Sequence, residues 1–225
     1  MLQIIGLGDS LMHFNSYDTY PQTGWFQVLD RFVKDPQEVR FLDFALNGRS
    51  TKSFIDEGQF EKSLSKAKKG DIVLISFGHN DEKIQDPSRY TAPYEGYLNN
   101  LKKFYEAFSK IGCTVCFLTS IARLKYGEDG KLVQTHGEYI QAMKDAAREC
   151  GAYLIDLNKL STEYFNRADF DANKKFIMTL EKGQYENYPN GNDDTTHLTM
   201  LGALKICELI LPELKKIPEL DKILL

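Results

Sequence analysis

The sequence predicts an α/β protein, built as a flavodoxin-like, three-layer α/β/α sandwich around a central parallel sheet of five strands. Short apolar, strand-like segments alternate with longer helix-like segments from one end of the chain to the other. This alternation is typical of parallel βαβ units, whose helices cover both faces of the sheet. Right-handed crossovers make the three-layer arrangement economical. With 225 residues and no repeat, low-complexity tract or linker, we expect one domain over 1–225.

Five segments have the length and apolar content of buried strands. The third is the clearest, because five of its seven residues, Ile72, Val73, Leu74, Ile75 and Phe77, are apolar. The expected strands span residues 2–7, 39–45, 71–77, 114–120 and 152–157.

Longer segments between these strands carry apolar residues at helical spacing. In 94–111 one face holds Tyr94, Tyr97, Leu98, Leu101, Phe104, Tyr105 and Phe108. We expect this aromatic face to pack into the core rather than to bind a ligand. The other expected helices span 20–33, 136–150 and about 199–213.

Two stretches interrupt the alternation. Residues 80–93 contain Pro87 and Pro93, and residues 165–196 are rich in Asn, Gly and Tyr and contain Pro189. We expect both to be long loops on the active-site side, because ligands of such folds bind beyond the carboxyl ends of the strands.

The composition excludes several classes of protein. The 28 basic and 32 acidic residues are interspersed and give a net charge of −4, with no long basic run for nucleic acid or an anionic membrane surface. No apolar run approaches the ~18 residues that cross a bilayer. We therefore expect neither a nucleic-acid nor a membrane partner, and the oligomeric state is left open.

The N-terminus and the cysteines bear on the compartment. No charged leader or small-residue cleavage site follows Met1, so we expect a cytoplasmic protein, although a removed export signal would leave the same sequence. Cys113 and Cys116 have CxxC spacing, but an odd offset on a strand directs two side chains to opposite faces. We expect the cysteines to be buried structural thiols rather than a metal or redox site.

Four short blocks hold the parts of a serine hydrolase, each beside the end of an expected strand or helix. They are Gly8-Asp9-Ser10, Asn47-Gly48-Arg49-Ser50, Gly78-His79-Asn80-Asp81 and Asp194-Thr195-Thr196-His197. A serine hydroxyl becomes a good nucleophile only when a base takes its proton. We expect Ser10 to be the nucleophile, His197 its base, and Asp194 the carboxylate that orients the imidazole.

Acyl transfer also needs hydrogen-bond donors for the developing oxyanion. The backbone N–H groups of Ser10 and Gly48 and the side-chain amide of Asn80 fit this need, and Gly48 has no Cβ to keep a substrate away. The nucleophile-elbow pattern GxSxG is absent, which disfavours an α/β-hydrolase fold. Neither HExxH nor paired CxxC spacing occurs, so we expect no metal and no cofactor.

These blocks resemble those of the SGNH, or GDSL-type, hydrolases, and more closely those of the rhamnogalacturonan acetylesterase-like branch. The matching segments are Gly24-Trp25, Gly48-Arg49-Ser50, Phe77-Gly78-His79-Asn80-Asp81, Asp194-Thr195-Thr196-His197, 53–58 and 135–137. The resemblance spans nearly the whole chain. It implies a metal-independent serine esterase that removes O-acetyl groups from pectic or related plant oligosaccharides through an acetyl-enzyme on Ser10.

Two other functions fit parts of the pattern. A different SGNH esterase, such as a lipase-like enzyme, a thioesterase or an arylesterase, would use the same mechanism. A lipid site should have a continuous apolar groove, whereas a sugar site should have exposed aromatic and polar groups. A non-catalytic carbohydrate-binding module is the more remote alternative, and the intact Ser10, Asp194 and His197 argue against it.

Several polar residues near the blocks have supporting roles to weigh. We expect Asp9 to bond to nearby backbone and Asp81 to brace its loop. Asn47 is either a turn residue or a substrate contact. We expect His79 to be a neutral, hydrogen-bonded imidazole that supports its loop rather than a second base. His136 either contacts sugar hydroxyls or caps the helix that begins there, and the sequence does not decide between them.

Overall fold

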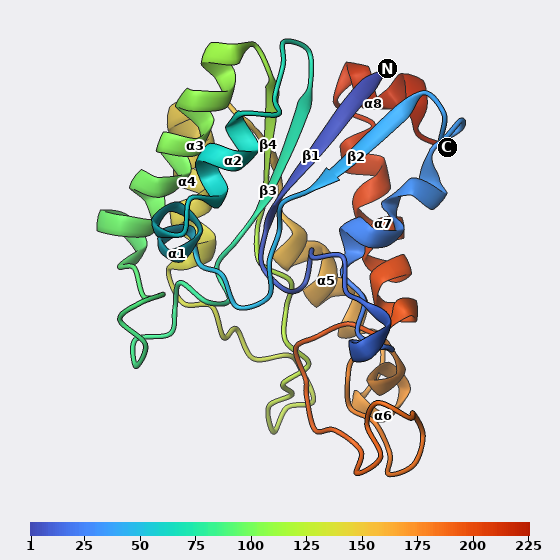
Figure 1. The fold of residues 1–225 in the computed structure, drawn as a ribbon. Coiled ribbons are helices and arrows are strands. Elements are labelled where there is room, and N and C mark those ends of the chain that lie inside the picture. The colour runs from blue at the N-terminus through green and yellow to red at the C-terminus, as the bar shows by residue number, and fades with distance from the viewer.

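The computed structural model describes all residues, 1–225, and folds them around one parallel sheet (Figure 1). The five strands lie in the order β2-β1-β3-β4-β5, and every neighbouring pair is parallel. This is the flavodoxin-like order, so the predicted fold class is confirmed. The strands are β1 (Leu2–Gly8), β2 (Val39–Asp43), β3 (Ile72–Ser76), β4 (Thr114–Leu118) and β5 (Tyr153–Ile155).

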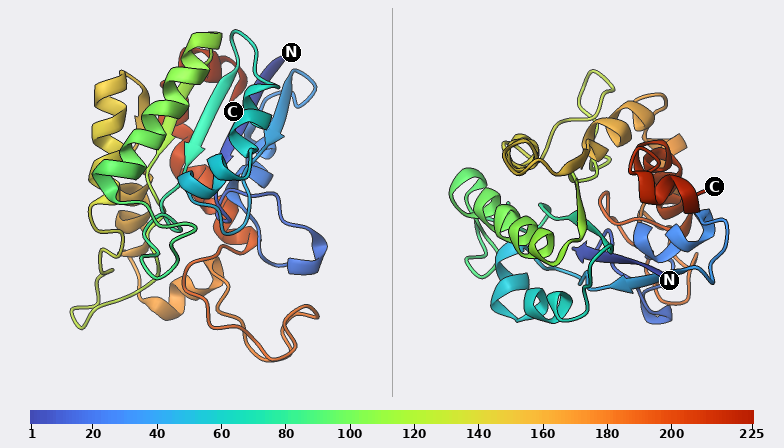
Figure 2. Two further views of the ribbon diagram at one scale, coloured as in Figure 1. Left: turned by 60° about the vertical axis from the view of Figure 1, so that its left-hand side comes forward. Right: turned by 90° about the horizontal axis from the view of Figure 1, so that it is seen from above.

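Helices cover both faces of the sheet, as Figure 1 and the view from above in Figure 2 show. One face carries α1 (Thr51–Asp56), α2 (Gln59–Leu64), α3 (Leu98–Ile111) and α4 (Tyr139–Cys150). The other carries a 3₁₀ helix (Trp25–Phe32), α5 (Leu157–Phe165), α7 (Met200–Leu214) and α8 (Pro218–Ile223). The shorter elements are α6 (Phe170–Asn173), a π-helical turn (Pro93–Tyr97) and two 3₁₀ turns (Tyr17–Thr19 and Lys174–Phe176).

Each face of the sheet buries its own apolar cluster. Successive side chains of a strand point to opposite faces, so on β1 Ile4 packs on the α7 side and Ile5 on the α3 side. The rings of Phe54, Phe77 and Phe104 on the α3 side lie with centroids 5.2 to 6.0 Å apart. Such edge-on and tilted contacts between rings add to the stability gained from burying their area.

The aromatic face predicted for 94–111 packs into this second cluster. Its buried members are Tyr97, Leu98, Leu101, Phe104 and Phe108, and Tyr94 at its start is exposed. The expectation that this face belongs to the core is confirmed.

The two cysteines with CxxC spacing lie on opposite sides of the sheet. Cys113 packs in the α3-side cluster and Cys116 in the α7-side cluster, as the odd offset predicts. Burial raises the pKa of the Cys116 thiol, so this side chain behaves as a small apolar group. The expectation fails for Cys150, which is half-buried rather than buried.

The helix predicted over 20–33 is wrong in its first part and in its type. Only Trp25–Phe32 is helical, and it is a 3₁₀ helix. The backbone N–H of Thr23 donates to the Leu198 carbonyl, and that of Trp25 donates to the Leu11 carbonyl. These long-range bonds replace the first helical turn. Between them, Gly24 packs so closely that a Cβ would lie 2.2 Å from the His13 carbonyl oxygen.

The structure also contains helices that the spacing analysis did not predict: α1, α2, α5, α6 and α8. The predicted loop 165–196 is therefore not wholly irregular, because α6 lies within it. Most of this segment and of 80–93 does lie beyond the carboxyl ends of the strands, at the lower edge in Figure 1. No helix is both long and apolar enough to cross a membrane.

Candidate active site

The four blocks meet at the carboxyl edge of the sheet. The last residues of β1 and β3, Gly8 and Ser76, are paired, so the segments that follow them leave neighbouring strands together. Ser10 Oγ lies 2.8 Å from Nε2 of His197, which is 187 residues further along the chain. His197 Nδ1 lies 2.6 Å from Oδ2 of Asp194. The three predicted residues thus form a continuous hydroxyl–imidazole–carboxylate chain.

Asp9 fixes the turn that presents Ser10. Its carbonyl accepts the backbone N–H groups of Met12 and His13, and its carboxylate accepts that of Leu11 at 3.0 Å. The second carboxylate oxygen is buried without a partner. Burial is the main cause that raises the pKa of Asp9 to about 6. The contacts of Asp9 are those of a brace on the backbone, as expected for it.

The loop before α7 holds the imidazole and its carboxylate together. Oδ1 of Asp194 accepts the backbone N–H groups of Thr196 at 2.7 Å and of His197 at 3.0 Å. On the other side, the backbone N–H of Met178 donates to the His197 carbonyl. Two residues beyond His197, the hydroxyl of Thr199 caps the first turn of α7. The backbone of His197 is therefore anchored both by neighbouring residues and by the distant segment that contains Met178.

Asp194 is held in its ionised form. Its partial burial works to raise its pKa, but the hydrogen bonds from His197 and Thr196 and the charge of His197 outweigh that effect. The pKa of Asp194 falls to about 2 as a result. At neutral pH Asp194 is an anion that accepts the Nδ1–H of His197, which leaves Nε2 free to take a proton from Ser10.

The candidate oxyanion donors come from three segments. Neither the Ser10 N–H nor the Gly48 N–H donates to another backbone carbonyl, so both are available to a substrate. Gly48 has a φ of +77°, a conformation that favours glycine. The Asn80 amide Nδ2 donates to the Arg49 carbonyl at 3.1 Å and keeps a second N–H to offer. Ser10 and Asn80 line the catalytic cavity, whereas Gly48 is not among its lining residues.

Arg89 supports Asn80, a role that no sequence pattern predicted. Its Nη1 lies 3.5 Å from Oδ1 of Asn80, and its Nε is 2.9 Å from a carboxylate oxygen of Asp86. A cation beside Oδ1 favours the amide orientation in which Nδ2 faces the site. Arg89 lies within the proline-containing loop, where no regular spacing marks a functional residue.

We expect Asn80→Ala to lower kcat by roughly 10²- to 10³-fold with a small change in KM, because an oxyanion donor acts chiefly in the transition state. Steady-state kinetics on an activated acetyl ester would measure this. Asn99→Ala, on the exposed surface of α3, is the matched control and should keep wild-type kinetics. Equal effects on kcat and KM from Asn80→Ala would remove Asn80 from the oxyanion hole.

Asn47 and Asp81 stabilise the loops around the site. The Asn47 amide donates to Oδ1 of Asn15 at 3.1 Å, which ties its turn to the segment that follows Ser10. Oδ1 of Asp81 accepts the Thr51 hydroxyl at 2.5 Å and the Thr91 hydroxyl at 3.0 Å. Asp81 therefore fastens α1 and the proline-containing loop to the end of β3. These contacts are the structural alternatives that the sequence suggested for both residues.

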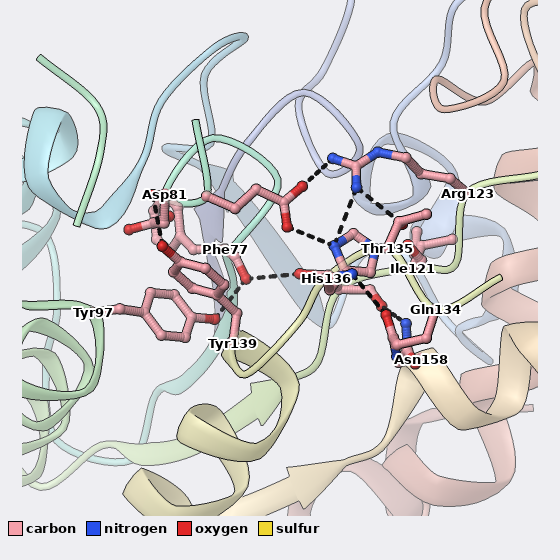
Figure 3. Close-up of polar contacts among 12 residues, drawn as sticks. Phe77, Asp81, Tyr97, Ile121, Arg123, Gln134, Thr135, His136, Tyr139 and Asn158 are labelled. Atoms are coloured by element: carbon pink, nitrogen blue, oxygen red, sulfur yellow. Dashed lines mark hydrogen bonds and ion pairs between the residues drawn. The ribbon is translucent and has the colours of Figure 1, made fainter. Parts of the chain in front are cut away.

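Of the two roles that the sequence left open for His136, the helix cap is wrong, and the contact with sugar hydroxyls stays a prediction. The residue is 1% exposed, and α4 begins only at Tyr139 without a side-chain cap. Instead Nε2 lies 2.9 Å from the Ile121 carbonyl, and Nδ1 lies 3.1 Å from a carboxylate oxygen of Glu82. Arg123 completes this network, because it pairs with Glu82 and its Nη1 donates to the Thr135 hydroxyl at 3.1 Å. Figure 3 shows Arg123 beside Thr135 and His136.

The sequence predicts that His79 is a neutral, hydrogen-bonded imidazole. It is neutral, but the expected hydrogen bonds are absent, so that part of the prediction is wrong. The residue is 6% exposed, and neither ring nitrogen has a partner within the chain. Burial, followed by the charges of His136 and Arg123, lowers its pKa well below the usual value. Its ring meets that of His136 edge to face, with the centroids 4.6 Å apart. His79 is thus held by packing, and it lines the wall of the catalytic cavity beside Asn80.

His79, Glu82 and His136 are the one set of side chains whose possible metal-ligating atoms gather, all within 4.8 Å of one another. Arg123 already supplies a positive charge to this set. Its guanidinium pairs with Glu82, and its Nη1 lies 3.5 Å from Nδ1 of His136. The charge of Glu82 is therefore balanced by the protein itself.

The cavity at Ser10 is small and has no hydrophobic residue in its lining. Its volume is about 260 Å³, and none of its lining residues is hydrophobic. They are Ser10, His79, Asn80, Lys83, Arg123, Asp194, Thr196 and His197. A continuous apolar groove, which an acyl chain would need, is not present at Ser10. The cavity has room for a short acyl group bound to a polar molecule.

The class of protein follows from this combination of fold and site. The chain matches the model of the GDSL-like lipase/acylhydrolase family over residues 7–203 and belongs to that family. The chain is thus a carboxylic ester hydrolase of the SGNH type.

The chain is also similar in sequence to individual acetylesterases of this type. The chain is 31% identical over 209 residues to rhamnogalacturonan acetylesterase RhgT of Bacillus subtilis, covering 93% of this chain and 88% of RhgT. It is 34% identical over 202 residues to a rhamnogalacturonan acetylesterase of Emericella nidulans, covering 80% and 75%. Among solved structures, protein YXIM_BACsu from Bacillus subtilis superposes with a TM-score of 0.80 at 24% identity, over 96% of this chain and 57% of that one. The last similarity concerns the fold alone.

Proposed function

We propose that the protein is a metal-independent serine esterase that removes O-acetyl groups from pectic, rhamnogalacturonan-type oligosaccharides or related plant oligosaccharides. The observation that carries this proposal is the chain of contacts from Ser10 Oγ through His197 to Asp194, with distances of 2.8 and 2.6 Å. These distances are those of a nucleophile with its base, and of a base with the carboxylate that orients it.

In the first half of the reaction, Ser10 Oγ attacks the carbonyl carbon of the acetyl ester while its proton moves to Nε2 of His197. The carbonyl oxygen becomes an oxyanion that accepts hydrogen bonds from the N–H groups of Ser10 and Gly48 and from the Asn80 amide. Collapse of this intermediate breaks the bond to the sugar oxygen. His197 gives that oxygen its proton, and the acetyl group remains on Ser10.

In the second half, a water molecule attacks the acetyl-enzyme while His197 again takes the proton. The oxyanion forms in the same place, and its collapse releases acetate and returns the proton to Ser10 Oγ. Asp194 stays ionised throughout and stabilises the imidazolium formed in each half. Every proton transfer is assigned to a side chain of this chain, and no step requires a metal ion.

Two findings support a sugar ester as the substrate. The cavity at Ser10 has only polar lining residues, which suits a hydroxyl-rich molecule and gives no hold to a lipid chain. The named relatives are rhamnogalacturonan acetylesterases, and the chain covers most of their length. The lipase-like alternative has no such feature in its favour.

Acetate release from a panel of esters tests the proposal. The panel comprises acetylated rhamnogalacturonan oligosaccharides, acetylated xylo-oligosaccharides, glucose pentaacetate, and 4-nitrophenyl esters of two to eight carbons. We expect the acetylated pectic oligosaccharides to give the highest kcat/KM, and the rate on 4-nitrophenyl esters to fall as the acyl chain lengthens. Faster hydrolysis of the eight-carbon ester would favour the lipase-like alternative, and no hydrolysis of any ester would refute the esterase.

A further inference from the structure

A second cavity adjoins the catalytic one. It has a volume of about 460 Å³ and is lined by Glu82, Gln85, Thr135, His136, Gly137 and Tyr139 in addition to the three residues that both cavities share. The shared residues are His79, Lys83 and Arg123. A molecule that places an ester at Ser10 can therefore extend past these three side chains into the larger space. Hydroxyl, amide and backbone groups around it are suited to the hydroxyls of a neighbouring sugar residue.

Lys83 stands out at this junction because its charge has no partner. The other basic groups near the site are paired, Arg123 with Glu82 and Arg89 with Asp86. The Lys83 ammonium forms no ion pair and donates no hydrogen bond within the chain, although the residue is half-buried. A cation that is partly removed from water gains stability from an anion placed beside it. The chain as a whole has a net charge of −4, so the positive charge of Lys83 beside Ser10 is opposite in sign to that of the whole protein.

The backbone holds the start of the Lys83 side chain in place. Its N–H donates to the Asn80 carbonyl at 3.2 Å, and its carbonyl accepts the N–H of Asp86 at 2.8 Å. Lys83 is therefore fixed three residues after the candidate oxyanion donor, on the same tight turn. Its flexible stem leaves the ammonium free to reach an anion in the larger cavity.

Arg123 and Glu82 limit where such an anion can bind. The carboxylate of Glu82 forms an ion pair with the guanidinium of Arg123. Its negative charge repels a second carboxylate from that side of the cavity. An incoming anion is therefore directed to Lys83 rather than to Arg123. The pairing gives the larger cavity one preferred position for negative charge.

We propose that the cavity beside the catalytic serine is a subsite for an acidic sugar, and that Lys83 binds the carboxylate of a uronic acid residue next to the acetylated one. This inference rests on the proposed function and adds its specificity-determining residue. A charge-assisted hydrogen bond of this kind favours the acidic oligosaccharide over a neutral one of the same shape.

The test compares two substrates that differ only in charge: an acetylated uronic-acid-containing oligosaccharide and the same oligosaccharide with its carboxyl groups reduced to primary alcohols. The readout is the ratio of kcat/KM for the acidic to the neutral substrate. We expect wild type to prefer the acidic substrate by roughly tenfold, Lys83→Gln to lose most of that preference through a higher KM, and Lys83→Arg to retain it. Lys110→Gln, an exposed lysine of α3, is the matched control and should keep the wild-type ratio.

Salt provides a second readout. The KM of wild type for the acidic substrate should rise with added NaCl, and that of Lys83→Gln should change much less, because the screened interaction has been removed. Equal kcat/KM values of wild type for the two substrates, or an unchanged ratio in Lys83→Gln, would overturn the subsite while leaving the esterase intact. Failure of wild type to release acetate from either substrate would instead overturn the proposed function and the subsite with it.

Discussion

Ser10→Ala should lower kcat on 4-nitrophenyl acetate by roughly 10⁴- to 10⁶-fold. The reason is that the hydroxyl 2.8 Å from the His197 imidazole is lost, and no acetyl-enzyme can form. The change removes one oxygen from a turn that Asp9 continues to brace. The thermal unfolding midpoint should therefore stay within a few degrees of wild type.

Ser16→Ala is the matched control for this variant, because Ser16 is exposed in the same N-terminal segment and its side chain makes no contact with the triad. An organofluorophosphonate gives independent evidence, since it should add covalently to Ser10 of wild type and not to the alanine variant. Activity of Ser10→Ala near the wild-type level would contradict the nucleophile assignment. So would a labelled peptide from another part of the chain.

The sheet could be predicted from the sequence because its signal is local and strong. A strand such as β3 is buried at every one of its positions, so its composition alone identifies it. Alternation with helices then fixes the parallel arrangement, and the crossover rule leaves few topologies. These steps predict the flavodoxin-like class with its parallel sheet, without any knowledge of contacts.

The short helices could not be predicted in the same way. α1 has six residues and begins with a capping box between Ser50 at the N-cap and Ser53 at position N3. The usual signature of a capping box has Glu or Gln at N3. In 20–33 the composition indicates a helix, but the N–H groups of Thr23 and Trp25 bond to distant carbonyls instead. The capping bonds of α1 are atypical, and the bonds that replace helix in 20–33 are long-range. Local sequence patterns therefore do not predict the helix boundaries in either segment.

In the site, too, some residues could be predicted from the sequence and others could not. The residues that we propose carry the chemistry, such as Ser10 and His197, lie in short blocks whose spacing and order are visible in the sequence. The residues that hold the cavity in shape are not: Arg89 and Arg123 lie outside the blocks and act through ion pairs with Asp86 and Glu82. Their importance depends on which charges meet after folding, and that information is absent from local spacing.

The second large effect is expected for Asp194→Asn, which should reduce kcat by roughly 10³- to 10⁴-fold. The carboxylate oxygen that lies 2.6 Å from His197 Nδ1 would be replaced by an amide that donates a hydrogen bond. The neutral imidazole would then accept at Nδ1 and carry its proton on Nε2. A protonated Nε2 cannot take the proton of Ser10, so the defect lies in the tautomer and not in the position of the ring.

The geometry of the loop should survive this change. The remaining oxygen of the substituted side chain can still accept the N–H groups of Thr196 and His197, as Oδ1 of Asp194 does now at 2.7 and 3.0 Å. Asp193→Asn removes the same charge at the exposed neighbouring position and should keep wild-type kcat, which separates a local loss of charge from the loss of orientation. If Asp194→Asn stays within tenfold of wild type, or if both variants lose activity equally, Asp194 does not orient the base.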